Sequence, residues 1–134
     1  MAKDTCDRDD IPELCLRFHR ASELIGRRWT GAIIYVLLQQ TCRFATLRDA
    51  IPGITDRMLS ERLQELEDEG LVDRAVVPET PVRVEYSLTK KGKGLAEAIQ
   101  TLSNWAEKNI PLSAVSRPKG RTRAAGKSVS GRSR

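Results

Sequence analysis

Hydrophobic side chains recur every three or four positions over most of residues 14–69, the spacing of one buried face of an α-helix. Glycine, proline and small polar residues divide this stretch into four predicted helices. The first ends at Gly26, the second begins at Trp29-Thr30, the third stops at Pro52-Gly53, and the fourth is capped by Thr55 and runs to about Glu69. Gly70 then suits the left-handed position that commonly follows a helix.

The spacing changes from helical to alternating after Gly70. Apolar and polar residues alternate over residues 82–88, which is typical of a half-buried strand, and residues 71–77 are its expected antiparallel partner. The link between them, residues 78–81, is bounded by proline and predicts a wide hairpin tip. Helical spacing returns after Thr89 in one last helix through Leu95, Ile99, Leu102 and Trp105. The sequence therefore predicts a mainly α-helical fold with a two-stranded β-hairpin.

The fourth predicted helix separates apolar from polar residues. Leu59, Leu63 and Leu66 share one face, and Arg57, Ser60, Glu61 and Gln64 lie on the opposite face. A short helix and a Pro-Gly turn precede it, as in a helix-turn-helix pair whose second helix enters the major groove of DNA.

This polar face carries the candidate DNA-binding residues. Arginine can donate two hydrogen bonds to guanine, and glutamine can pair with adenine. An ordinary solvated helix face is the alternative interpretation. The candidates are Thr55, Arg57, Ser60, Glu61, Arg62 and Gln64, of which Thr55 and Arg62 are expected to contact phosphates.

The predicted hairpin follows the helix-turn-helix pair directly, where it can lie along the DNA backbone as a wing. Arg83, beside the proline-rich tip, is the candidate to reach a phosphate or the narrow minor groove. The alternative is a surface ion pair with Glu79 or Glu85, which contributes little to stability. A short helix with a Pro-Gly turn, a helix with one polar face and a hairpin follow one another in this order, which favours a winged helix-turn-helix.

Three blocks of the chain, ELIGRRWTGAII, RFATLRDAIPGITDRMLSERLQELEDEGLV and PVRVEYSLTKKG, together resemble the HxlR family of bacterial transcription regulators. The resemblance covers about residues 15–108. It implies a winged-helix homodimer that binds inverted-repeat operators and whose first and last helices form much of the dimer interface. Packing of these two helices against each other within one chain is the alternative. The candidate interface residues are Leu14, Phe18, Leu102 and Trp105.

Length and charge divide the 134 residues into one domain with two unlike ends. Residues 111–134 contain seven Lys or Arg and no Asp or Glu, so residues 1–110 carry −2 of the net charge of +5. We expect an acidic flexible segment over residues 1–10, the winged domain over 11–110, and a basic disordered tail over 111–134. The tail either adds nonspecific attraction to DNA or keeps the protein soluble.

Other classes of protein fit the composition poorly. No apolar run is long enough to span a membrane, the N-terminus is acidic, and three cysteines are too few for a disulfide framework. We therefore expect a cytoplasmic protein with reduced thiols. One histidine and no glycine-rich phosphate loop argue against an enzyme, and no cofactor or metal is expected. A winged-helix protein-interaction module without specific DNA binding is the alternative function, because residues 1–110 are nearly neutral.

Cys15 lies at the start of the first predicted helix, beside Arg17 and Arg20. Helix N-termini and nearby cations make a cysteine easier to oxidise. The resemblance implies that a cysteine at this position senses oxidants or electrophiles in some family members, and a packed apolar residue is the alternative. Cys6 lies among aspartates and could serve as a resolving partner, while Cys42 is expected to pack. Cys15 and His19 share a helix face but are too few to hold a metal.

Overall fold

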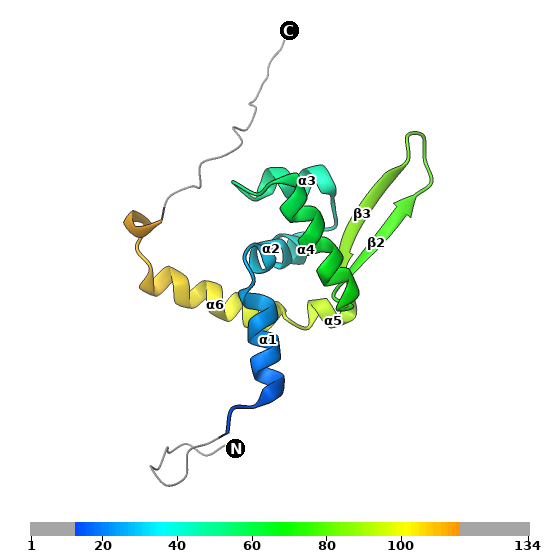
Figure 1. Ribbon diagram of the computed structural model, residues 1–134. Coiled ribbons are helices and arrows are strands. Elements are labelled where there is room, and N and C mark those ends of the chain that lie inside the picture. Colours follow the sequence, from blue (N-terminus) through cyan, green and yellow to red (C-terminus); the bar gives the residue numbers. More distant parts are fainter. Residues whose placement is uncertain (1–12, 116–134) are drawn as a thin grey trace.

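The computed structural model describes residues 13–115 (Figure 1). The predicted segment 1–10 and residues 116–134 of the predicted tail lie outside this range. The elements are α1 (Leu16–Gly26), α2 (Thr30–Gln39), β1 (Cys42–Arg43), α3 (Phe44–Ala50), α4 (Asp56–Asp68), β2 (Val72–Val77), β3 (Arg83–Leu88), α5 (Lys90–Lys93), α6 (Ala96–Asn109) and a 3₁₀ helix, η1 (Leu112–Ala114).

The four predicted helices and the predicted hairpin are confirmed, and the residues expected to limit them do so. The Thr55 hydroxyl accepts a hydrogen bond from the backbone N–H of Met58 (3.1 Å), which caps α4. Gly70 follows α4 with a φ of 79°, a conformation that costs glycine no steric strain. The hairpin strands pair antiparallel from Val72–Leu88 to Val77–Arg83.

Three details differ from the prediction. The sheet has three strands, in the order β1-β3-β2, because Cys42 and Arg43 pair with Tyr86 and Glu85 of β3. Two residues are too few to show an alternating pattern, so the sequence carried no signal for β1. The predicted last helix is two helices, α5 and α6, and the predicted tail begins with η1 rather than with irregular chain.

The core lies between α2, α3, α4 and the sheet. Its fully buried side chains include Ile33 and Ile34 of α2, Leu47 of α3 and Leu59 of α4. Two polar residues are buried with them, Thr30 and Arg62. In Figure 1, α1 and α6 extend away from this core in different directions, and the hairpin extends in a third. The compact unit is thus the winged helix-turn-helix, and the terminal helices lie at its margin.

The hairpin and α5 meet at Gly92, which is buried. A Cβ at this position would lie 2.3 Å from the carbonyl oxygen of Leu71. The same oxygen accepts a hydrogen bond from the Thr89 N–H (3.0 Å), and the Thr89 hydroxyl accepts one from the Gly92 N–H (3.0 Å). Glycine is therefore required here by close backbone approach.

Gly92→Ala is expected to lower the free energy of unfolding by about 1–3 kcal/mol, because the added methyl group must displace backbone atoms. Urea denaturation followed by circular dichroism at one protein concentration measures the change. Gly31→Ala is the control, because a Cβ there meets nothing within 4 Å and alanine favours helix. An unchanged midpoint for Gly92→Ala would contradict the close approach of Gly92 to the backbone of Leu71.

Candidate nucleic-acid interface

The turn between α3 and α4 is anchored from both sides. Ile51 and Ile54 are buried next to Pro52 and Gly53, and Gly53 has a φ of 90°. Along α4 the leucines at positions 59, 63 and 66 are buried, while Arg57, Ser60, Glu61 and Gln64 are exposed. The predicted division of this helix into an apolar inner face and a polar outer face is confirmed.

Two residues of the outer face pair with a carboxylate one turn further along α4. The Arg57 guanidinium lies 3.1 Å from Glu61, and the Gln64 amide donates to Asp68 (3.0 Å). The Arg57 side chain is 85% exposed, and exposed pairs at this spacing contribute only about 0.3–0.5 kcal/mol. These side chains can therefore exchange their carboxylate partners for base edges at little cost.

Arg62 differs from the other candidates because only 7% of it is exposed. Its Nε donates to the carbonyl oxygen of Arg28 (2.9 Å), and its Nη1 lies 3.2 Å from Glu65. This arrangement holds α4 against the segment before α2 and gives Arg62 a positioning role. A sequence signal existed, because Arg62 stands three residues after Leu59 and four before Leu66, within the apolar stripe.

Further ion pairs connect α4 with the end of α1. Arg27 lies 3.1 Å from Glu65, the carboxylate that also pairs with Arg62, and Arg20 of α1 pairs with Glu69. A polar pocket of about 640 Å³ lies between the two helices, lined by these side chains and by Glu23 and Leu24. Sequence reasoning missed these pairs, which join residues more than 35 positions apart.

On the hairpin, the Arg83 guanidinium pairs with Glu85 (2.9 Å) and with Glu79. These contacts are the ion-pair alternative that the sequence left open. The hydrogen bond with Glu85 is the main reason that the pKa of Arg83 is raised above its ordinary value, and the charge of Glu79 adds to it. Two carboxylates thus surround one guanidinium.

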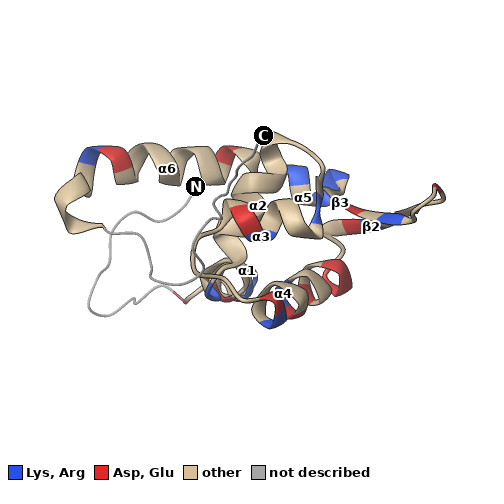
Figure 2. Ribbon diagram, turned by 90° about the horizontal axis from the view of Figure 1, so that it is seen from above, with Lys and Arg blue, Asp and Glu red and all other residues tan. Residues whose placement is uncertain are grey.

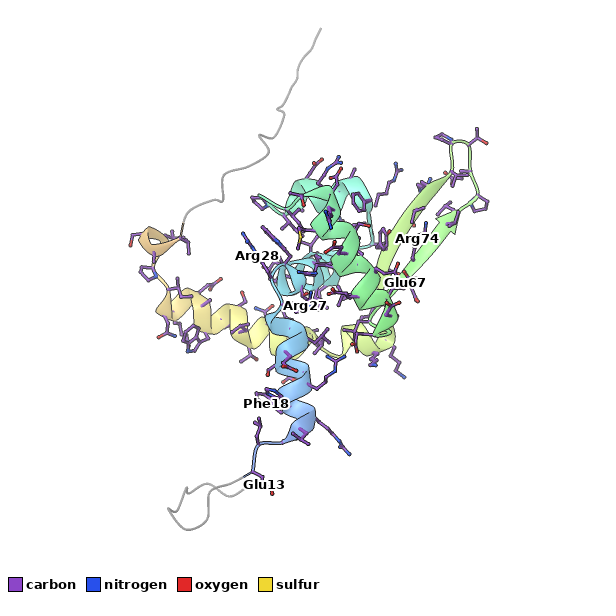
Figure 3. All side chains as sticks on the ribbon, viewed as in Figure 1. Glu13, Phe18, Arg27, Arg28, Glu67 and Arg74 are labelled. Atoms are coloured by element: carbon purple, nitrogen blue, oxygen red, sulfur yellow. The ribbon has the colours of Figure 1, made fainter. Side chains whose placement is uncertain are left out.

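A groove of about 400 Å³ separates α4 from the hairpin. It is lined by Ser60, Leu63, Gln64, Glu67, Arg74 and Tyr86. Figure 3 labels Glu67 on α4 and Arg74 on β2, which face each other across it. Sequence reasoning did not single out Arg74. Figure 2 shows that acidic as well as basic residues lie along α4, in keeping with the nearly neutral charge of the domain.

The candidate interface residues lie on exposed helix faces. The exposed fraction is 64% for Phe18 on α1, and 56% and 55% for Leu102 and Trp105 on α6. Leu14, just before α1, is also exposed. Leu102 and Trp105 line an apolar groove of about 790 Å³ on α6. Packing among residues 13–115 therefore does not cover these side chains.

The two cysteines within residues 13–115 occupy opposite environments. Cys15 is exposed at the N-cap of α1, whereas Cys42 is buried in β1, and burial raises the pKa of the Cys42 thiol. The predicted packing of Cys42 is confirmed. His19 lies 3.5 Å from Glu23. Within residues 13–115 no cluster of three metal-ligating side chains occurs, and no helix is long and apolar enough to cross a membrane.

Comparison with known proteins identifies close relatives. Residues 24–114 match the HxlR-like helix-turn-helix family. YvaP of Bacillus subtilis strain 168, an uncharacterized HTH-type transcriptional regulator, is 50% identical over 94 residues, which are 70% of this chain and 87% of YvaP. YodB of the same strain, an HTH-type transcriptional regulator, is 45% identical over 94 residues, 70% of this chain and 84% of YodB.

Solved structures agree with this relationship. Reduced YodB from B. subtilis matches with a TM-score of 0.66 and 43% identity, covering 73% of this chain and 96% of the YodB chain. The redox regulator HypR in its oxidized form matches with a TM-score of 0.68 and 35% identity, covering 72% of this chain and 99% of the HypR chain.

The fold, the outer face of α4 and these relatives lead to one assignment. The winged helix-turn-helix predicted from the order of the elements is confirmed, and so is the resemblance carried by the three sequence blocks. This chain belongs to the HxlR-like helix-turn-helix family of DNA-binding transcription regulators.

Proposed function

We propose that this regulator binds an inverted-repeat operator as a homodimer and reads bases with the first half of α4. The observation that carries the proposal is the outer face of α4, where Arg57, Ser60 and Gln64 are exposed while the opposite face is fully buried. A helix held in this way presents its first turns to the major groove. Thr55 still has a hydroxyl hydrogen to donate to a phosphate, because its oxygen is the acceptor in the cap.

The apolar side chains on α1 and α6 support the homodimer. Phe18, Leu102 and Trp105 are large and more than half exposed, and a second copy of the chain would remove them from water. A twofold dimer would also place two recognition helices about one helical turn of DNA apart, roughly 34 Å. An inverted repeat has the same twofold symmetry.

The alternative is a winged-helix module that binds another protein. The specific observation in its favour is that α4 carries carboxylates beside its polar candidates, including Glu61 and Asp68, each paired with one of them. Contacts with phosphates make the affinity for duplex DNA fall steeply as the salt concentration rises. A module that binds another protein instead makes no phosphate contacts, so its affinity for duplex DNA should be weak and depend little on salt. Salt titration of the wild type on duplex DNA separates the two functions.

We also infer that modification of Cys15 regulates DNA binding. Cys15 is exposed, so reagents can reach it, and α1 is joined to α4 through Arg20–Glu69 and Arg27–Glu65. A displacement of α1 would therefore also move α4 within one chain. In a dimer it would change the distance between the two copies of α4, and so their contacts with the two half-sites. YodB is known in reduced, diamide-treated and quinone-bound forms, and HypR in oxidized and reduced forms.

Arg57→Ala is expected to weaken binding to the operator by about 1–3 kcal/mol and binding to unrelated duplex DNA much less, because a base contact carries sequence information. Fluorescence anisotropy on an operator selected from random duplexes, with a scrambled duplex as control, measures both. Equal weakening on the two duplexes would show that Arg57 contacts phosphate and would contradict its assignment as a base-reading residue.

Trp105→Ala is expected to raise the dissociation constant of the dimer by about thirtyfold or more, since large buried aromatic anchors at interfaces commonly contribute 2 kcal/mol or more. Sedimentation equilibrium measures the constant. Val76→Ala is the matched control, because Val76 is similarly exposed, at 53%, but lies on the hairpin. A wild-type chain that stays monomeric at micromolar concentration would refute the dimer.

Mild diamide is expected to weaken operator binding by the wild type at least about tenfold, to leave Cys15→Ser unchanged, and to be reversed by reductant. Anisotropy before and after treatment measures this. Cys42 is an internal reference, because its burial and raised thiol pKa should keep it unlabelled by iodoacetamide until the chain unfolds. Equal loss of binding in both proteins, or none in either, would exclude Cys15 from regulation.

A further inference from the structure

The two arginines of the hairpin lie on opposite faces of the sheet. Arg74 pairs in register with Tyr86, two residues along each strand from the buried pair Val72 and Leu88. Because side chains alternate between faces along a strand, Arg74 lies on the face that packs toward the core and α4. Arg83 pairs in register with Val77 and belongs to the other face.

The surroundings of the two guanidinium groups differ as much as their positions. Arg83 is paired with both Glu79 and Glu85, so this cluster carries a net negative charge. Arg74 is exposed, and no hydrogen bond or ion pair joins its guanidinium to any of residues 13–115. Its charge is therefore available to a ligand, whereas the charge of Arg83 is already compensated twice.

Arg74 also lies beside the residues expected to read bases. It lines the groove between α4 and the hairpin together with Ser60 and Gln64. When α4 occupies the major groove and the hairpin lies beside it, the sugar-phosphate backbone that borders the major groove passes between the two elements. A guanidinium in that space can donate two parallel hydrogen bonds to one phosphate.

We propose that Arg74 makes the hairpin's contact with the DNA backbone, by binding a phosphate in the groove between α4 and β2, and that Arg83 makes none. Arg83 instead supports the hairpin through its two glutamates. The inference rests on the proposed DNA binding and adds a positioning residue to it. Glu67, on the other wall of the groove, opposes the phosphate by charge and limits its affinity.

The test compares two variants that remove the same charge from the same hairpin, Arg74→Gln and Arg83→Gln. Affinity for the operator is measured by fluorescence anisotropy between 50 and 300 mM KCl. Each lost phosphate contact makes the negative slope of log affinity against log salt flatter by about 0.9. A dimer on two half-sites loses two such contacts, so Arg74→Gln should flatten the slope by about 1.8. Arg83→Gln should leave the slope unchanged.

Two further variants separate charge from structure. Arg74→Lys keeps the charge, so it should retain the wild-type slope while binding more weakly, because an ammonium cannot form the bidentate contact. Glu67→Gln should tighten binding to operator and to scrambled duplex alike. Thermal melting of each variant shows that the domain remains folded.

The outcomes distinguish the inference from the proposed function. A flatter slope for Arg83→Gln with an unchanged slope for Arg74→Gln would overturn the inference while DNA binding stands. Unchanged slopes in both variants, with a steep wild-type slope, would also overturn it. A wild-type chain whose affinity for duplex DNA does not depend on salt would instead refute the proposed function itself.

Discussion

The geometry of the proposed DNA-binding surface depends on one buried guanidinium. Arg62 stands within the apolar stripe of α4, where an arginine must find partners or leave its charge uncompensated away from water. It finds them in the carbonyl oxygen of Arg28 and the carboxylate of Glu65. Because these bonds are directional, they fix the rotation of α4 about its own axis together with the buried leucines at positions 59, 63 and 66. That rotation determines which side chains of α4 face outward.

The segment that accepts the hydrogen bond from Arg62, just before α2, has an unusual backbone conformation. Arg28 stacks over the ring of Trp29 at 4.7 Å, and Trp29 adopts a left-handed backbone with a φ of 79° just before α2. Non-glycine residues rarely adopt this conformation, so the surrounding contacts must maintain it. Thr30 is buried at the start of α2 immediately afterwards. The hydrogen bond from Arg62 to Arg28 therefore connects the middle of α4 with the start of α2.

Glu65 extends this connection to the end of the terminal helix α1, because its carboxylate pairs with both Arg62 and Arg27. The Arg20–Glu69 pair adds a second connection one turn further along α4. The helix that carries Cys15 and Phe18 is thus linked through charged side chains to the helix with the base-reading candidates. These outer pairs are exposed to solvent and individually weak, so they can rearrange without unfolding the core.

The sequence by itself determined the features that depend on neighbours within one element. Thr55 and Gly70 limit α4, alternation reveals the hairpin, and the leucine stripe identifies the inner face of the recognition helix. Only the tertiary structure decided which partners the arginines take, because the carbonyl oxygen bound by Arg62 lies on another segment and the sequence left two interpretations open for Arg83. The sequence made Arg62 and Arg83 candidates for DNA contacts, with an ion pair as the alternative for Arg83. In the structure Arg62 bonds to Arg28, 34 positions away, and Arg83 pairs with two glutamates. Arg74 had no distinguishing pattern until strand register and packing placed it beside α4. The side-chain spacing of an element reports which face is buried, whereas a charged side chain takes its role from whatever the fold brings within hydrogen-bonding distance.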